Sequence, residues 1–476
     1  MSNSSLDNDA EAEKRLVRKM DLTVFPILFV VYMLSFLDRI NISNARIQGM
    51  TQDLDLTGNR FNIALFVYFV PYILLEVPSN MIIRKMRPSL YLGGLMFCWG
   101  IVNMCMGFVK SYGALVGLRF LLGVFEAGVM PGVVYLISMY YKRHELQIRM
   151  SFFFSSTLFG GAFGGLLAYA IAHLGGRAGM AAWRWIFIIE GAITAVVSVG
   201  AAFLIVDWPE QCKFLSPEEL ALLKKRLAAD GGDIARMDTL NPYAYKLILS
   251  DWKIWLSSFV YMGIGITGYS TTFFMPTILK EFGWTAESAQ VHTIPVYVVS
   301  GAGMLLAAWA SDRLHHRYGF IMLGALLSTI GYGVLLSQQQ HYATLSSSTK
   351  YGAVFLAALG GYIGTPIALA WLANNLSGHW KRAFGSGIQI TVGNVVGIIA
   401  SNIFVEHEAP TYRTGYGVAL GLTWFGALTA TVLALLLWRE NRLRRDGKRD
   451  GRIATGTPKE EIDNMGDYHP AFRFTI

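Results

Sequence analysis

Twelve apolar runs follow one another along the chain, each long enough to cross a bilayer as a helix, with short charged segments between them. A hydrocarbon core about 30 Å thick needs about 20 mostly apolar residues per helix. Charged residues make up only 15% of the 476 residues, against about 25% in ordinary soluble chains. The pattern therefore predicts an all-α polytopic membrane protein and argues against a soluble enzyme. The runs lie near residues 22–45, 61–83, 89–109, 112–139, 149–173, 183–206, 252–279, 292–311, 320–337, 351–376, 384–405 and 415–438.

The polar segment 207–251 divides these runs into six plus six, which predicts two pseudo-symmetric six-helix bundles. Ser216, Pro217, Glu218 and Glu219 open a Leu- and Lys-rich helix pattern inside it. Most of the 40 Lys and Arg residues lie in the two tails, this segment and the even-numbered loops, so both termini are expected in the cytoplasm. The expected parts are an N-tail (1–21), a first bundle (22–206), a linker (207–251), a second bundle (252–438) and a C-tail (439–476).

Two short basic segments occupy corresponding positions in the two halves. NMIIRKMRP (Asn80 to Pro88) follows the second run, and ASDRLHHRY (Ala310 to Tyr318) follows the eighth. Such an internal repeat favours alternating access around a central cavity. Arg84, Lys85, Asp312 and Arg313 are the expected gating residues of these two segments.

Ionisable residues inside the spans are few and lie in the first half only. A charge at the bilayer centre costs several kcal/mol unless it is paired or faces water, so each one is a functional candidate. Ion coupling is therefore expected in the first half, with neutral polar and aromatic contacts supplied by the second. These residues are Asp38, Arg39, Glu76, Arg119, Glu126 and Glu190.

Arg39 and Arg119 are expected at similar depths in the first and fourth spans, because helices rise about 1.5 Å per residue. Two guanidinium groups at one depth suit a carboxylate, which a neutral solute would not require. We therefore expect a small organic anion as substrate. The alternative is structural: Arg39 pairs with Asp38 or Glu126, and Arg119 with Glu126, to neutralise the bundle.

Asp38 and Glu126 are the expected proton-coupling residues, because burial and a neighbouring guanidinium act in opposite directions on a carboxyl group. Glu76 and Glu190 are left outside this set as helix-packing or gating residues. Tyr68 and Tyr72 lie one helical turn apart and either face the cavity or form an aromatic packing stripe.

Amide side chains in the second half are costly against lipid. Asn375 and Gln389 are examples, and Asn394 is the best candidate for the cavity. Phe273 and Phe274 suit either an outer gate or plain packing. No nucleophile, phosphate-binding or metal-binding motif occurs, so neither an enzyme nor a metal site is expected.

Several longer stretches carry a family resemblance. Ser311, Asp312 and Arg313 resemble the short cytoplasmic loop motif of the major facilitator superfamily, whereas the first-half copy has Asn80 and Arg84 where a Gly and an acidic residue are usual. The stretches LDRINISNA (from Leu37), LRFLLGVFEAGVMPG (from Leu118), WRWIFIIEG (from Trp183), FLSPEE (from Phe214) and KRAFGSGIQITVGNVVG (from Lys381) resemble the anion:cation symporter family. Within it, the chain is most similar to the fungal allantoate permease-like branch, which includes carriers of nicotinate and other vitamins.

The resemblance implies the major facilitator fold and proton-coupled uptake of a carboxylate-bearing solute. It assigns coupling and anion binding to Asp38, Arg39, Arg119 and Glu126. It also implies substrate contacts for a tyrosine of the second span and an asparagine of the eleventh, which match Tyr72 and Asn394.

Together these features predict a plasma-membrane symporter for a carboxylate such as nicotinate, allantoate, another vitamin or a sugar acid. Protons are the expected coupling ion, no cofactor is expected, and the partners are the solute and the lipid bilayer rather than nucleic acid. Each twelve-span unit is expected to work as a monomer. Two alternatives stay open: an exporter or vacuolar carrier on the same fold, and a nutrient sensor that does not transport.

Overall fold

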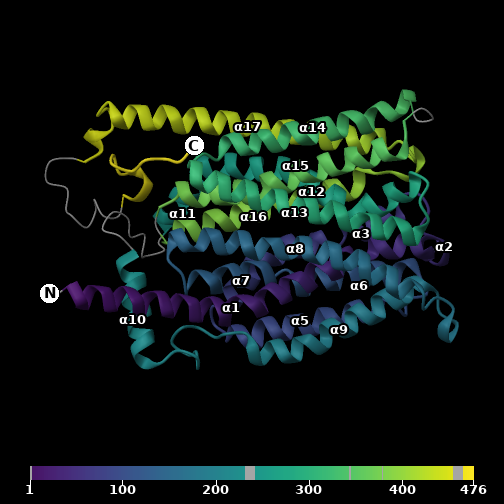
Figure 1. Ribbon diagram of the computed structural model, residues 1–476, viewed down its shortest axis with the longest axis horizontal. Helices are drawn as coiled ribbons and strands as arrows, with labels where there is room; N and C mark the ends of the chain where they lie inside the picture. Colours follow the sequence, from purple (N-terminus) through teal and green to yellow (C-terminus); the bar gives the residue numbers. More distant parts are fainter. Residues whose placement is uncertain (1–2, 231–241, 342–344, 378, 454–464) are drawn as a thin grey trace.

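The computed structural model describes residues 3–230, 242–341, 345–377, 379–453 and 465–476. These residues form a bundle of long helices, and the all-α polytopic class predicted from the sequence is confirmed (Figure 1). In the first half the elements are α1 (Asn3–Ala45), the π-helical η1 (Arg46–Met50), α2 (Thr51–Asp53), α3 (Arg60–Phe66), α4 (Phe69–Ile83), α5 (Pro88–Met106), α6 (Tyr112–Glu126), α7 (Val129–Ser138), α8 (Arg143–Ala172) and α9 (Ala182–Leu204). They continue with α10 (Pro217–Asp230), α11 (Pro242–Leu249), α12 (Trp252–Glu281), α13 (Ala286–Leu314), α14 (Tyr318–His341), α15 (Ser347–Asn375), α16 (His379–Ile403) and α17 (Arg413–Arg445).

Eleven helical segments in the described residues are long and apolar enough to cross a membrane. The one predicted span that is not among these eleven, residues 252–279, coincides with α12, a helix of 30 residues. This helix packs against α15, α16 and α17, and most of its side chains are buried, including Ser258, Thr267 and Thr272. A helix enclosed by other helices needs less hydrophobicity than one that faces lipid, so α12 carries more hydroxyl groups than its neighbours.

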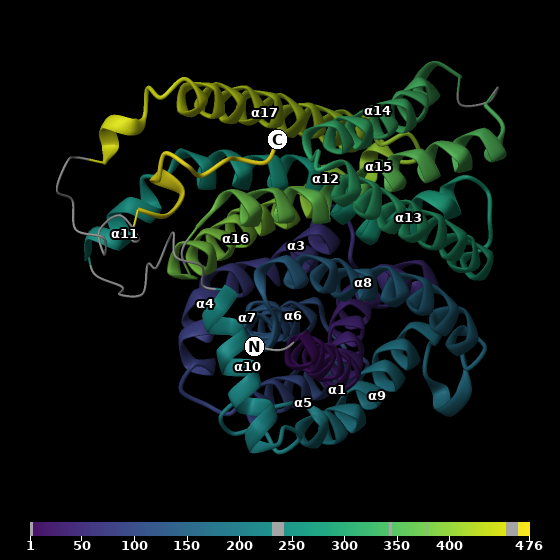
Figure 2. The same ribbon diagram turned by 60° about the vertical axis from the view of Figure 1, so that its left-hand side comes forward.

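The helices form two groups, α1 to α9 and α12 to α17, which Figure 2 shows lying one above the other. Both termini, α10 and α11 lie toward one end of the bundle, which we name the terminus end (Figure 1). The opposite end, where Figure 1 shows α2, is the distal end. The predicted N-tail is helical from Asn3, because α1 begins there and runs directly into the first span.

The helix predicted at Ser216 is present as α10. The Ser216 hydroxyl accepts from the backbone N–H of Glu219, and the Glu219 carboxylate accepts from the N–H of Ser216, which is a complete capping box. The ammonium of Lys19 donates to the same carboxylate at 2.7 Å and thereby lowers the pKa of Glu219. This contact attaches α10 to the terminus end of α1.

Residues 465–476 return to the terminus end of the second half. Asp467 is buried and accepts from Lys253 at 2.7 Å and from Lys381 at 2.8 Å, while Asp251 pairs with the same two lysines. Burial raises the pKa of Asp251, but the two ammonium groups outweigh it and lower the pKa below its ordinary value of 3.8. We name these four residues the tail cluster.

Backbone contacts complete the docking of this segment. The indole N–H of Trp371 and the amide of Asn375 both donate to Thr475 O, and Arg444 donates to the carbonyl oxygens of Asp467, His469 and Phe472. The predicted cost of Asn375 against lipid does not arise, because its amide holds the C-terminal segment instead.

The two halves approach each other most closely where α8 packs against α13. A Cβ atom on Gly165 would lie 2.5 Å from Thr293 Oγ1 and 2.8 Å from the backbone oxygen of Gln290. A Cβ atom on Gly161 would lie 2.6 Å from the Tyr297 ring. Only glycine permits this spacing, as small residues do in other membrane helix pairs.

The distal end is closed by contacts between the halves. The Asn62 amide donates to Ser401 O and Phe404 O at 2.7 and 3.1 Å, and the Phe61 ring meets Phe274 edge to face. Phe274 also stacks on Phe404 at 4.6 Å between ring centroids. Other hydrogen bonds across this end join Gly58 to Glu406, Gln48 to Gln290 and Lys280 to Ile47.

Further from this end, Phe69 touches Tyr269 and Phe273 of the second half. The arrangement is therefore closed at the distal end.

Candidate functional site

Two arginines and a tyrosine meet in the middle of the first half. The guanidinium carbons of Arg39 (α1) and Arg119 (α6) lie 5.3 and 5.2 Å from the centroid of the Tyr68 ring. All three side chains are buried. The structure thus brings together the two guanidinium groups that the sequence placed at one depth, and an aromatic ring contacts both of them.

A break between α3 and α4 shapes this site. Pro71 has no N–H to donate one turn back, and the helix is interrupted at Val67 and Tyr68. In an unbroken helix Ala64 O would bond Tyr68 N, but here it accepts from Arg119 Nε at 3.2 Å. A Cβ atom on Gly123 of α6 would lie 2.1 Å from Tyr68 O, so glycine allows α6 to lie against the break.

Arg119 has only part of its hydrogen-bonding capacity satisfied. Its Nη1 and Nη2 atoms are buried and have no hydrogen-bond partner among the described residues. A buried guanidinium with an unused pair of donors is costly unless an anion binds it. Because these two nitrogens form one edge of a planar fork, they can receive both oxygens of a carboxylate.

Glu126, at the end of α6, is already bonded on one oxygen. Its Oε2 accepts from Arg39 Nη2 at 3.2 Å, from the Tyr68 hydroxyl at 2.7 Å and from the Ser35 hydroxyl at 3.2 Å. Its Oε1 has no partner in the described structure. Of the pairings considered from the sequence, Arg39 with Glu126 is therefore present, whereas Arg119 makes no ion pair with a described carboxylate.

Asp38 lies in a different environment from Arg39, although the two are neighbours in sequence. Successive side chains on a helix point about 100° apart, so Asp38 faces away from the arginine site. It accepts from Trp99, Asn103 and Thr194 at 3.0, 2.6 and 2.7 Å. The expectation that Asp38 sits beside an arginine is wrong in this arrangement, because its donors are neutral.

The second half contributes Asn394 of α16 and Tyr269 of α12. The Tyr269 hydroxyl donates to Asn394 Oδ1 at 2.8 Å, and the amide nitrogen of Asn394 has no partner in the described residues. Glu76 of α4 faces Asn394 and Thr391 across the boundary, with neither carboxylate oxygen in a hydrogen bond. Sequence reasoning placed Glu76 near a helix end and missed this position, since only the packing of the halves reveals it.

Tyr72 completes the aromatic wall. Its ring centroid lies 5.1 Å from the Arg39 guanidinium carbon and 5.5 Å from the Tyr68 ring. Gln389, in contrast, bonds Ser257 O and Ala368 O and links three helices rather than facing the arginines.

The predicted gating residues lie at the terminus end, where α4 and α13 end. Asp312 pairs with Arg317 at 2.5 Å, and Arg313 lies over the Trp309 ring at 5.5 Å. Arg84 lies 4.7 Å from the Tyr135 ring of α7, and Lys85 follows the end of α4. Their gating role remains a prediction.

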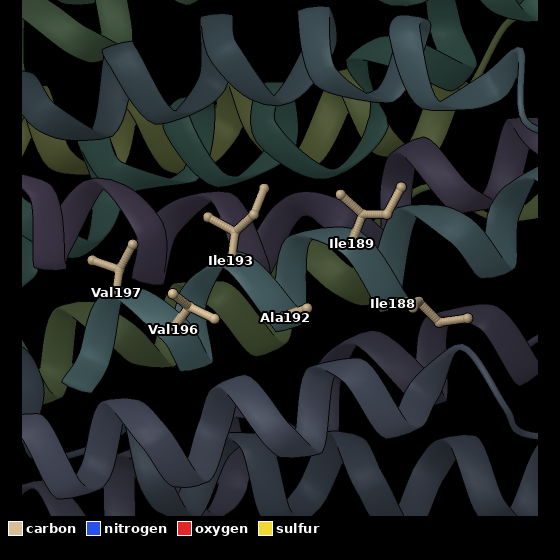
Figure 3. Close-up of a pocket in the computed structure, with 6 residues that line it drawn as sticks. All are labelled: Ile188, Ile189, Ala192, Ile193, Val196 and Val197. Carbon is tan, nitrogen blue, oxygen red and sulfur yellow. The ribbon is translucent and has the colours of Figure 1, made fainter. Parts of the chain in front are cut away.

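An apolar groove on α9 offers nothing to an anion. Figure 3 shows its lining of six small and aliphatic side chains: Ile188, Ile189, Ala192, Ile193, Val196 and Val197. Val196 is largely exposed, as expected for a span that faces lipid. The parts of the chain that the structure describes contain no group of three His, Cys, Asp or Glu side chains placed to hold a metal ion.

Comparison with known proteins gives a consistent family. The sequence profile of the Major Facilitator Superfamily matches residues 28–401. The chain is 33% identical over 473 residues to the MFS-type transporter cnsO of Penicillium expansum, covering 98% of this chain and 91% of the relative. It is 29% identical over 468 residues to the high-affinity nicotinic acid transporter of Saccharomyces cerevisiae, covering 97% and 85%.

Solved structures agree on the fold. A bacterial homolog to the human lysosomal transporter Spinster, in an inward-facing and occupied conformation, superposes with a TM-score of 0.65 at 15% identity, covering 86% of this chain and 95% of that one. The xylose transporter XylE from E. coli, in a partially occluded inward-open conformation, gives 0.63 at 16% identity, covering 88% and 97%.

Proposed function

The chain belongs to the major facilitator superfamily, and from that premise we propose that it is a proton-coupled symporter of a small organic anion. The substrate carries a carboxylate, as nicotinate, allantoate, other vitamins and sugar acids do, and moves into the cell by alternating access. The protein lies in the plasma membrane with its terminus end toward the cytoplasm, in keeping with the Lys and Arg content of that end.

The unpartnered edge of Arg119 is the observation that carries this proposal. A carboxylate can accept from both nitrogens and balance their charge, whereas a neutral substrate would leave the buried positive charge without a counterion. Tyr68 and Tyr72 on one side and Asn394 on the other supply contacts for the rest of a small molecule. The nicotinic acid transporter among the relatives is consistent with a substrate of this class.

Glu126 supports the proton as coupling ion. It competes with a substrate carboxylate for Arg39, since both are anions and Arg39 already bonds Glu126. A proton on Glu126 removes that competition and frees Arg39 for the substrate. Loss of the proton restores the Arg39 to Glu126 pair and favours release.

The closed distal end supports alternating access. At that end the Phe61 and Phe274 rings meet across the halves, and the Asn62 amide donates to backbone oxygens of the second half. Rocking about the α8 and α13 contact would open the distal end and expose the same arginines to the other side.

The test is uptake of labelled carboxylates into proteoliposomes with an inward proton gradient applied or withheld. We expect one member of a panel that includes nicotinate and allantoate to accumulate only with the gradient. Arg119→Gln should abolish that uptake while the protein stays folded in the membrane, because the substrate loses its main cation.

A matched control is Arg184→Gln. Arg184 also donates to backbone carbonyls, those of Gly107 and Val109, but lies at the distal end away from the site. It should transport normally per folded molecule. Equal uptake by Arg119→Gln and the wild type would refute the anion site. Accumulation driven by an outward proton gradient would mean that the protein exports its substrate rather than importing it.

A further inference from the structure

Two carboxylic acids of the first half are buried without a cation. Asp38 of α1 is fully buried, and Glu190 of α9 is 1% exposed. Glu190 lies close enough to Asp38 to interact with its charge and faces Asn41. Within the described structure, neither carboxylate is in an ion pair. Two ionised carboxylates together in a membrane interior would cost far more than one.

Asp38 has the donors that an ionised carboxylate needs. Oδ1 accepts from Asn103 Nδ2 and, at 3.4 Å, from Asn41 Nδ2, while Oδ2 accepts from Trp99 Nε1 and Thr194 Oγ1. All four donors are neutral, and both oxygens are used. A proton added to Asp38 would displace one of these donors, so the surroundings favour its ionised form.

Glu190 has the opposite surroundings. Neither of its oxygens has a hydrogen-bond partner among the described residues, and Asn41 Oδ1 nearby also lacks a donor. A proton on Glu190 would remove one buried charge and supply a donor for an orphaned acceptor. A single proton on Glu190 would therefore both neutralise the buried carboxylate and give Asn41 Oδ1 a donor.

Among the described residues, titratable groups on the other elements packed against α9 contact other partners; Asp53 of α2, for example, accepts from Trp183 at the start of α9. Where α5 meets this region it presents Trp99 and Asn103, Arg46 of η1 turns to the Phe61 and Phe274 rings, and His173 of α8 contacts Tyr169 O. Asp38 is thus the titratable group that faces Glu190 from α1.

We propose that Glu190 and Asp38 form a carboxylate pair that holds one proton in the wall of the first half, with Glu190 as the residue that carries it. This inference rests on the proposed proton-coupled function and adds a second proton site, separate from Glu126. The neutral Glu190 lets Asp38 stay charged one residue away from Arg39. Loss of its proton would place two anions behind the substrate site and hinder transport.

Infrared difference spectroscopy of the purified full chain tests the protonation directly. The wild type should show the C=O band of a protonated carboxyl group at neutral pH, and this band should be missing from Glu190→Gln. Glu190→Asp keeps the carboxyl group and should shift the band, which gives a second reading if Glu190→Gln is not recovered folded. Identical spectra for the wild type and a folded variant would overturn the proposal.

Substrate exchange at equal pH on both sides tests the role in transport. The exchange rate of the wild type should fall at alkaline pH as Glu190 loses its proton. Glu190→Gln mimics the protonated form, so its exchange rate should fall only at a pH about one unit or more higher than in the wild type. Ser198→Ala, a buried substitution two turns further along α9, should match the wild type.

An unchanged alkaline limb in Glu190→Gln would overturn the transport role. If the wild type exchanges no carboxylate at all, the proposed function fails, while the infrared result still decides whether Glu190 carries a proton.

Discussion

In the first half of the molecule, ionisable side chains lie deep within the bundle, at Arg39, Glu76, Arg119, Glu126 and the Asp38 and Glu190 pair. In the second half, the buried ion pairs gather at the terminus end, where Asp251, Lys253, Lys381 and Asp467 hold the C-terminal segment. Charges are expensive at membrane depth and cheaper near its edge. Under the proposed function, we expect the first half to bind the substrate and couple it to protons, and the second half to offer neutral contacts and use its charges for structure.

Among variants that test this difference between the halves, Glu126→Gln should have the largest effect. Arg39 would lose its buried partner, and the site would lose a proton-binding group. We expect gradient-driven accumulation to fall about 100-fold, equivalent to about 3 kcal/mol for a buried pair broken on one side. Exchange at equal pH should change much less, because both arginines remain available to the substrate.

Proteoliposome uptake with and without a pH gradient measures this difference. Glu218→Gln, on the exposed face of α10, is the control and should behave like the wild type. Undiminished accumulation by Glu126→Gln would assign coupling to other residues.

A smaller effect is expected from Asn394→Ala in the second half. The substitution removes a neutral amide that is bonded to Tyr269 and has a free nitrogen toward the boundary. We expect KM to rise about tenfold, the size of one buried hydrogen bond, with the dependence on the proton gradient unchanged. Asn402→Ala, on the same helix but exposed, should leave KM as it is. A change in proton dependence instead would contradict the division between the halves.

The smallest effect on transport should follow Asp467→Asn. Lys253 and Lys381 would then share Asp251 alone, which we expect to lower the free energy of unfolding by about 3 kcal/mol. KM should change less than about twofold, since the tail cluster lies away from the arginines. Thermal unfolding in detergent and uptake kinetics measure the two quantities, with Asp446→Asn as the exposed control. A large shift in KM with unchanged stability would mean that the second half also uses its charges for transport.

Local signals in the sequence predicted the helices well, because apolar runs and capping residues act over a few neighbouring positions. Ser216 and Glu219 form a capping box where the sequence predicted a helix start, and the apolar runs coincide with the long helices. The shared depth of Arg39 and Arg119 also followed from rise per residue alone. Coupling and binding roles for these residues remain predictions.

Positions that depend on which faces meet were harder to predict. Asp38 and Arg39 are adjacent in sequence, which suggested a pair, yet the helical rotation sends them to different surroundings. Glu76 meets Asn394 only through the packing of the two halves, and Asn375 finds its partner about 100 residues further along the chain. No periodicity within one helix carries that information.

If the two halves rock against each other, they need a contact surface on which they can pivot without steric clash. Gly165 gives α8 such a surface, because the backbone of α13 comes within 2.8 Å of where a methyl group would stand. A methyl group added at Gly165 would push the two halves apart on one side of this contact. It would thereby bias the protein toward one of its two openings. Under the proposed alternating access, the close fit of α8 against α13 would therefore set how the protein divides its time between its two openings.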